Sequence, residues 1–407
     1  MMDKTRENRS LELRFIQLYF WIYWLQCING TYLNLYLNKV SGFSGTQIGI
    51  LSGVFSASGV VLSPLIGIRF DGSRKRPAFL AVLALLTGAA FCVYAAPVPW
   101  YAFLPVAVAF ACGWIPLVPL MDSTASTELV SGASRLGYGG YRRWGTVGFA
   151  LAGGVAGQLT GWWGLWTVFP AFAACALMVA WQARGIPEHV TTHRASGSAG
   201  RNSPRVPDPS AVLHLLRMPN FRNFLGVVLL ASVGAGACYT FRAIYLSEIG
   251  LSNRAIGTLW LLIVPGEVVC FSCASAWRER WGTGPLVTFG LVTAGVRWVL
   301  LSFVNVPVLY LVELLHGIGF AVYYPAAVAF VQREVPPHLR GTAQVLFFST
   351  AAGIGTALGA AGAGRMYDLV GMRPVLWFGG GLQILGGILQ FLLVRHHPST
   401  AGAGAGR

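Results

Sequence analysis

The chain has 407 residues, of which 55% are hydrophobic, 11% are charged and 51 are glycine. This composition is too apolar, and the chain too long, for one soluble core, so a soluble globular protein is excluded. The formal net charge is +15, but the basic residues fall between apolar segments. Their placement favours a membrane-orientation signal over a nucleic-acid-binding surface.

The N-terminal segment is charged, and no small-residue cleavage site follows the first apolar run, so we expect a retained first span. A hydrocarbon core about 30 Å thick requires roughly 20 apolar residues per helix. Twelve runs reach this length, with approximate bounds 15–37, 46–68, 77–96, 99–122, 141–160, 163–182, 221–246, 255–277, 284–304, 307–331, 341–364 and 372–394. The sequence therefore predicts an all-α integral membrane protein with twelve transmembrane helices.

One long polar interval separates the sixth run from the seventh. Residues 184–220 are rich in arginine, proline and serine, a composition that cannot bury enough apolar surface to fold alone. We expect an N-terminal six-helix bundle over residues 1–183, a cytoplasmic linker over 184–220, a C-terminal six-helix bundle over 221–394 and a disordered tail over 395–407.

A short internal repeat supports two similar bundles. Tyr36-Leu37 leads through a turn to Ile48-Gly49-x-Leu51, and Tyr245-Leu246 leads through Gly250-Leu251-Ser252 to Ile256-Gly257-x-Leu259, at an offset of about 208 residues. Two parallel halves are the architecture expected when a transport site lies between rocking bundles.

The basic residues predict the orientation of the chain. With the N-terminus inside, the inward segments hold 23 lysines and arginines and the outward loops hold four. By the positive-inside rule both termini are cytoplasmic, and we expect a multi-pass protein of the bacterial inner membrane.

Glycines recur at every fourth position in two of the runs, at Gly153, Gly157 and Gly161 and again at Gly355 and Gly359. Such spacing lets helix backbones approach closely. Seven cysteines lie inside apolar runs, and the Cys270-x-x-Cys273 pair has no second pair, so we expect neither a metal site nor a cofactor.

Five charged residues fall at or within the apolar runs: Asp122, Arg242, Glu267, Arg297 and Glu313. An ionised residue at mid-bilayer costs about 2.5 to 3.5 kcal/mol on insertion scales, so we expect these side chains to face an interior cavity and to pair.

Glu267 and Arg297 lie near the middle of consecutive runs, and a carboxyl there could carry a proton; a static structural ion pair is the alternative. Glu313 and His316 are one helical turn apart, and an intramembrane histidine can titrate near neutral pH. A hydrogen-bonded helix pair is the alternative for these two.

Two helix faces combine aromatic and polar side chains. They carry Tyr19, Tyr23, Gln26 and Gly30 in the first run, and Cys238, Arg242 and Tyr245 in the seventh. Rings and amides suit a solute with both apolar and hydrogen-bonding surface, although polar helix packing explains any single one of them.

The loop after the second run reads Gly67-Ile-Arg-Phe-Asp71-Gly-Ser-Arg74-Lys75-Arg76-Pro77. It resembles the loop signature of the major facilitator superfamily, in which a glycine, an aspartate four residues later and a basic cluster tie the loop to neighbouring helix ends. The resemblance implies a gating loop comprising Gly67, Asp71, Arg74 and Lys75. A plain topogenic charge cluster is the alternative.

A second resemblance covers nearly the whole chain. Segments similar to the phenylpropionate permease branch of that superfamily are Pro116-Leu117-Val118-Pro119-Leu120-Met121-Asp122, Tyr138-Gly139-x-x-Arg142-x-Trp144-Gly145-Thr146, Gly266-Glu267-Val268, Val296-Arg297-Trp298 and Leu315-His316-Gly317. This branch is related to nucleoside:proton symporters and, more remotely, to lactose permease.

By the lactose permease pattern, a carboxylate and an arginine, here Asp122 and Arg142, help bind the solute. Glu267, Arg297, Glu313 and His316 correspond to the proton-coupling groups of the later spans. Glu313 precedes His316 here, whereas the carboxylate of lactose permease follows its histidine.

We therefore expect a secondary transporter with the major facilitator fold, a monomer in the lipid bilayer that carries a nucleoside, sugar or aromatic acid together with protons. An exporter or facilitator of the same fold is one alternative. A membrane sensor or scaffold is another, and it predicts that the buried charges tolerate apolar replacement. An enzyme is disfavoured, because no nucleophile lies beside a base.

Overall fold

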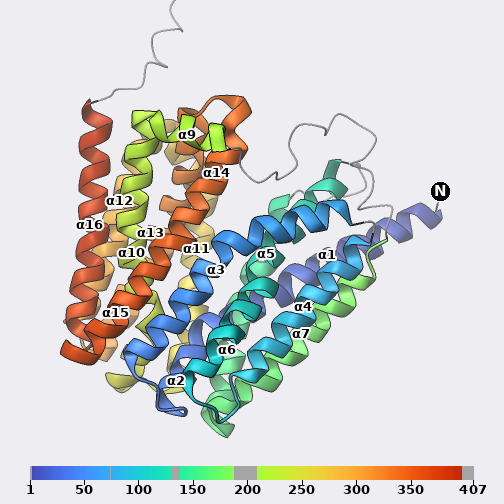
Figure 1. The fold of residues 1–407 in the computed structure, drawn as a ribbon, viewed down its shortest axis with the longest axis horizontal. Helices are drawn as coiled ribbons and strands as arrows, with labels where there is room; N and C mark the ends of the chain where they lie inside the picture. The colour runs from blue at the N-terminus through green and yellow to red at the C-terminus, as the bar shows by residue number, and fades with distance from the viewer. Residues whose placement is uncertain (1, 74, 131–137, 188–208, 397–407) are drawn as a thin grey trace, which may run out of the picture. The chain divides into compact units, whose positions relative to one another are not determined.

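In the computed structural model, the described residues are 2–73, 75–130, 138–187 and 209–396, and every regular element in them is helical (Figure 1). They form two compact units. Unit 1 contains the described residues of Met1–Val206 together with Thr240–Val264. Unit 2 contains the described residues of Pro207–Tyr239 and Pro265–Arg407. The helices α10 and α11 therefore contribute residues to both units, and in α11 the boundary falls at Pro265.

Unit 1 packs its helices as neighbouring pairs: α1 lies against α6 and α7, α4 against α5 and α7, and α3 against α5. A π-helical segment, Asn29–Leu33, joins α1 to α2 without a break in the helix. The bounds are α1 (Met2–Ile28), α2 (Asn34–Lys39), α3 (Gly45–Gly72), α4 (Arg76–Val93), α5 (Phe103–Val130), α6 (Tyr138–Trp163) and α7 (Val168–Arg184).

In unit 2, α12 packs against both α13 and α16, and α15 packs against α16. A second π-helical segment, Ser349–Gly355, joins α14 to α15. The bounds are α9 (Pro209–Arg217), α10 (Pro219–Glu248), α11 (Asn253–Trp281), α12 (Thr283–Leu301), α13 (Val306–Glu334), α14 (Arg340–Phe348), α15 (Thr356–Val370) and α16 (Met372–His396).

Ten helical segments in the described residues are long and apolar enough to cross a membrane. The two expected spans that do not reach this hydropathy fall in α1 with α2 and in α6. Both are long, but their hydropathy is lowered by charged, amide, tyrosine and tryptophan side chains and, in α6, by many glycines.

The expected linker contains one short helix. Residues 188–208 lie outside the described residues, but α9 forms immediately after them and buries Leu215 completely. Leu215 joins a core cluster with Phe221, Phe224 and Phe347. The expected linker over residues 184–220 thus includes a helix, α9, whose apolar face packs on the core of unit 2 rather than folding alone. The assignment of six helices to each bundle stays a prediction.

The internal repeat has matching turn geometry in both copies. Gly42 and Gly250 take positive φ angles of 71° and 94°, which favour glycine. The backbone N–H group that follows each glycine donates a hydrogen bond to a carbonyl of the preceding helix. Phe43 N–H donates to the Leu37 carbonyl at 2.9 Å, and Leu251 N–H donates to the Leu246 carbonyl at 3.0 Å. Both copies thus reverse the chain with a positive-φ glycine and a returning amide, although the bonded residues are six positions apart in the first copy and five in the second.

The glycine spacing corresponds to close backbone contacts within each unit. In unit 1, a Cβ added at Gly153 would lie 2.7 Å from the carbonyl oxygen of Gly257, and one added at Gly257 would collide with the carbonyl of Gly153. In unit 2, a Cβ at Gly359 would collide with the carbonyl of Val233. At these positions the backbones touch, and glycine is the residue that permits it.

Candidate functional site

A polar cluster in unit 1 joins three helices around Asp122. The Arg142 guanidinium nitrogen Nη1 lies 3.3 Å from Asp122 Oδ2, and the Tyr19 hydroxyl donates to Asp122 Oδ1 at 2.5 Å. The ring of Tyr19 is stacked parallel to that of Tyr141, with centroids 6.5 Å apart. The side chains of Arg142 and Asp122 are 38% and 23% exposed, so this cluster is accessible to a solute. The structure thus brings together the two residues expected at the junction of the fourth and fifth spans.

The Asp122 cluster is held by local sequence features of its helices. Asp122 follows Pro116 and Pro119 within α5, and Arg142 lies in the first turns of α6. Tyr19 comes from α1 and is 1% exposed. A carboxylate that accepts hydrogen bonds from both a guanidinium and a phenol is fixed in position, because each donor restricts a different oxygen.

Unit 2 contains a fully buried ion pair. Arg297 Nη1 on α12 lies 2.9 Å from Glu313 Oε2 on α13, and both side chains are 0% exposed. The guanidinium also lies over two aromatic rings, 3.7 Å from the ring centroid of Trp298 and 5.6 Å from that of Tyr239. These rings contribute cation–π attraction, which helps a cation that hydrogen-bonds through only one of its three nitrogens.

This pairing decides between alternatives that the sequence left open. Glu267 was a candidate partner of Arg297, since both lie near the middle of their helices, but the carboxylate paired with Arg297 in the described residues is that of Glu313. Glu267, half-buried on α11 just after Pro265, has no ion-pair partner in the described part of the chain. Depth along a helix fixes how far a residue lies across the membrane, but not the direction in which its side chain points.

His316 lies one turn after Glu313 on α13, as expected, and its ring makes a contact outside that helix. Its Nδ1 is 3.0 Å from the hydroxyl of Tyr239 on α10. The Tyr239 ring in turn meets Trp298 edge-on, with centroids 4.9 Å apart. Arg297, Glu313, Tyr239 and His316 therefore form one connected polar and aromatic cluster, the Arg297 cluster, within unit 2.

Arg242 lies in unit 1 and faces an aromatic ring. It is 4% exposed, and its guanidinium lies 4.6 Å from the ring centroid of Trp260. The Trp260 indole donates to the Thr31 hydroxyl at 2.9 Å. Tyr245, one turn after Arg242 on α10, is also buried.

The expected aromatic and amide face of α1 is partly accessible. Tyr23 is half-buried and Gln26 is exposed. A Cβ added at Gly145 of α6 would lie 2.8 Å from the Tyr23 ring, so α6 approaches α1 at that tyrosine. The placement agrees with side chains that line a cavity, and their role stays a prediction.

The loop between α3 and α4 is tied by Asp71 and Arg76. Arg76 Nη2 donates to the Asp71 backbone carbonyl at 3.0 Å and lies 4.0 Å from Asp71 Oδ1. Gly67 is buried within α3, and Lys75 is exposed at the start of α4. Arg74 lies outside the described residues. Within the described residues, Asp71 contacts Arg76, the last residue of the basic cluster.

Three functional candidates were not singled out as site residues from the sequence: Tyr141, Tyr239 and Trp260. Tyr19 was placed on the polar face of the first span, but not beside Asp122. Tyr239 lies three residues before Arg242, and an aromatic residue close to a charge in an apolar run is the signal that could have found it. Trp260 lies 18 positions after Arg242, so no local pattern links the two. Tyr141 directly precedes Arg142 in the quoted motif.

The two units hold different kinds of polar group. The Asp122 cluster offers a carboxylate, a guanidinium and phenols that are partly exposed. The Arg297 cluster offers a buried pair, and α11 offers the separate carboxyl of Glu267.

Comparison with known proteins gives the family. The family model described as the MFS_1 like family matches residues 13–378. The chain is 30% identical over 370 residues to the "Probable 3-phenylpropionic acid transporter" of Escherichia coli (strain K12), covering 89% of each chain. It is 28% identical over 366 residues to the "Putative nucleoside transporter YegT" of the same strain, covering 88% of this chain and 83% of the relative.

Among solved structures, the nucleoside transporter NupG matches with a TM-score of 0.82 at 19% identity, covering 95% of this chain and 99% of NupG. At that identity the match shows the fold alone. Since the family model spans most of the chain and the matched relatives are transporters, the chain belongs to the MFS_1 like family and is an all-helical, multi-pass membrane transporter with the major facilitator fold, not an enzyme.

Proposed function

We propose that this transporter carries a small organic solute, a nucleoside, sugar or aromatic acid, in symport with protons by alternating access. It acts as a monomer in the bacterial inner membrane with both termini in the cytoplasm. The names of the matched relatives support the solute classes, since one is a putative nucleoside transporter and one a probable 3-phenylpropionic acid transporter.

In this proposal, the Asp122 cluster binds the solute. Its carboxylate, guanidinium and phenol hydroxyls can donate to and accept from ribose hydroxyls, sugar hydroxyls or a carboxylate. The parallel rings of Tyr19 and Tyr141 provide aromatic surface beside them. Binding sites of this kind combine apolar walls with a few oriented polar groups.

The observation that carries the proton-coupling part is the separation of Glu267 from the Arg297–Glu313 pair. Arg297 is already neutralised by Glu313, so Glu267 can take up and release a proton without breaking an ion pair. Coupling requires a proton affinity that differs between the two states of the carrier. A carboxyl on a proline-containing helix can change its surroundings as that helix moves, whereas the buried pair stays closed.

The test uses Glu267→Gln, which fixes the neutral form while keeping the size of the side chain. Proteoliposomes containing the full chain receive labelled uridine, lactose or 3-phenylpropionate, with and without an imposed proton gradient. We expect the variant to exchange labelled for unlabelled solute but to fail to accumulate it uphill. The matched control is Glu279→Gln, an exposed acid at the end of the same helix, which should leave both activities unchanged.

Three outcomes count against the proposal. Full uphill uptake by Glu267→Gln removes Glu267 as the coupling residue and moves that role to Glu313 and His316. Loss of exchange together with loss of solute binding assigns Glu267 to solute binding. If the wild-type protein exchanges solute but an imposed proton gradient never causes uphill accumulation, the protein is a facilitator.

A further inference from the structure

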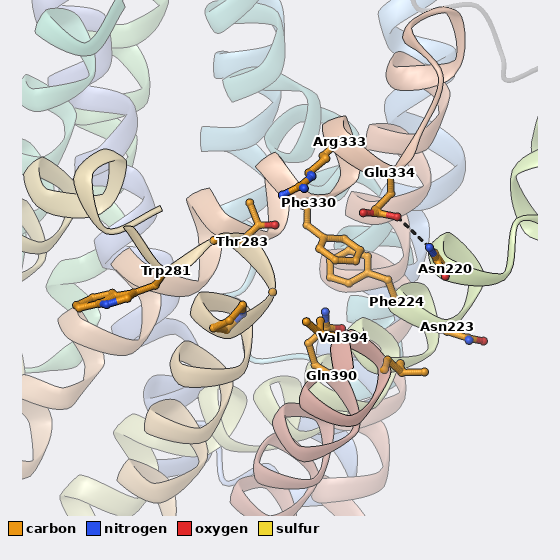
Figure 2. A pocket seen from close by; sticks show the side chains of 14 residues that line it. Asn220, Asn223, Phe224, Trp281, Thr283, Phe330, Arg333, Glu334, Gln390 and Val394 are labelled. Carbon is orange, nitrogen blue, oxygen red and sulfur yellow. Dashed lines mark hydrogen bonds between the residues drawn. The ribbon is translucent and has the colours of Figure 1, made fainter. Parts of the chain in front are cut away.

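A cavity at one end of unit 2 is separate from every residue assigned to transport above. It has a volume of about 370 Å³ and lies where the start of α10, the end of α11, the start of α12 and the ends of α13 and α16 meet (Figure 2). This size is near the lower end of the roughly 300–1,000 Å³ range of ligand pockets. All of its lining residues belong to unit 2.

One end of the cavity is electropositive. Gly282, with a φ of 80°, precedes α12, and no side chain caps that helix. Thr283 and Gly284 lie in the first turn of α12, where backbone N–H groups have no carbonyl partner within the helix. Both residues line the cavity. Arg333, from the end of α13, also lines the cavity (Figure 2). A helix N-terminus together with a guanidinium favours an anionic group.

A buried amide reaches the same cavity from α16. Gln390 is 1% exposed, yet neither its Nε2 nor its Oε1 has a hydrogen-bond partner in the described part of the chain. Figure 2 shows the Gln390 side chain extending toward the other side chains that line the cavity. A buried amide left unpaired is costly, so a ligand group that both donates and accepts a hydrogen bond would satisfy it.

The wall between these two ends is aromatic. Phe224 and Phe330 are stacked with ring centroids 4.5 Å apart and an interplanar angle of 29°. The nearby carboxylate of Glu334 is held on the side of Asn220, whose Nδ2 donates to Glu334 Oε2 at 3.1 Å (Figure 2). This hydrogen bond engages one carboxylate oxygen of Glu334, which also lines the cavity.

We propose that this cavity is a second binding site, one that takes a small soluble organic acid with a single ring. The carboxylate lies at the start of α12 beside Arg333, the ring lies along Phe224 and Phe330, and a hydroxyl at the far end of the ring pairs with Gln390. With the orientation proposed above, the site opens to the cytoplasm, so its ligand is a cytoplasmic metabolite acid.

The test is equilibrium dialysis of 4-hydroxybenzoate against the full-length protein in phosphatidylcholine nanodiscs. We expect saturable binding by the wild type, no saturable binding of 4-hydroxybenzyl alcohol, which lacks the charge, and about tenfold weaker binding by Gln390→Leu. Gln390→Leu removes two unpaired buried atoms, so its melting temperature should equal or exceed that of the wild type. Arg333→Gln, at an exposed position, should also weaken binding about tenfold.

The matched control is an exposed arginine outside the lining of the cavity. Arg340→Gln, on α14, should bind 4-hydroxybenzoate with the wild-type dissociation constant. This result holds whether or not the protein is a symporter, so failure here is distinct from failure of the proposed function.

Three results would overturn the proposal. The first is that 4-hydroxybenzoate shows no saturable binding up to about 10 mM. The second is that the dissociation constants of Gln390→Leu and Arg333→Gln lie within threefold of the wild-type value. The third is that phosphatidylglycerol in the nanodiscs abolishes binding. The last result would make a lipid headgroup the occupant.

Discussion

The Arg297–Glu313 pair shows how burial decides the energetic role of a charge. Both side chains are 0% exposed and 2.9 Å apart, so each compensates the desolvation of the other. Removing one partner of a buried pair leaves the remaining charge without compensation, which is costlier than removing both. The Asp122–Arg142 pair is more exposed, so its loss should cost less folding free energy than the loss of a buried pair.

We predict that Arg297→Leu and Glu313→Leu each lower the free energy of unfolding by about 3–5 kcal/mol. The double variant should lose clearly less than the sum of the two. Chemical denaturation of the purified protein in detergent measures all three values. Additive losses would mean that the two residues do not act as a pair.

The Asp122 cluster leads to a second residue-scale prediction. Because Tyr19 and Arg142 hold different oxygens of the same carboxylate, we expect Asp122→Asn, Arg142→Gln and Tyr19→Phe each to weaken solute binding. The Asp122→Asn/Arg142→Gln double variant should lose less than the sum of the two single losses. Arg143→Gln, the exposed neighbour of Arg142, is the control and should bind normally. Additive losses in the double variant would refute direct pairing.

At the scale of elements, close glycine contacts set how helices pack within a unit. Gly153 of α6 and Gly257 of α11 meet backbone to backbone in unit 1. A methyl group cannot fit there unless the helices separate, and overpacking of this kind costs about 1–3 kcal/mol.

Gly257→Ala should therefore lower the stability of the protein by about 1–3 kcal/mol, whereas Gly226→Ala should be neutral or stabilising by up to about 1 kcal/mol. Gly226 lies on α10 with open space around its Cβ direction, which makes it the matched control. Thermal unfolding in detergent compares the two variants. Equal melting temperatures would show that α6 and α11 can move apart to fit the added methyl group without loss of stability.

The α3–α4 connection is a second element with a testable role. The Asp71 carbonyl and carboxylate both face the Arg76 guanidinium, so these residues rather than Lys75 tie the loop. We predict that Asp71→Asn and Arg76→Gln leave expression intact but slow solute uptake, whereas Lys75→Gln transports at the wild-type rate. Unchanged uptake in the first two variants would reduce the loop to a topology signal.

At the scale of the whole molecule, charge distribution predicts the orientation of the chain. The inward segments carry 23 basic residues against four in the outward loops, and such asymmetry places the basic side in the cytoplasm. A reporter fused after Arg395 or inserted near Ser198 should therefore be active in the cytoplasm. Periplasmic reporter activity at either site would reverse the proposed topology.

Local sequence was sufficient for much of this protein. Apolar runs of about 20 residues predicted the membrane helices, because hydropathy depends on the residues of the run itself. The turns at Gly42 and Gly250 were predictable from the repeat for the same reason, since a reversal is built by the residues within it. Asp122 and Arg142 lie on consecutive helices joined by a short connection, so their contact required little long-range information.

Tertiary structure alone decided the partners that depend on helix rotation. Arg297 pairs with Glu313 rather than Glu267, because position along a helix gives the depth of a side chain but not its direction. Tyr19 reaches Asp122 across 103 positions of sequence, and the cavity around Gln390 is formed by the ends of five helices. Such contacts follow from how separate helices pack, which no pattern within any one of them encodes.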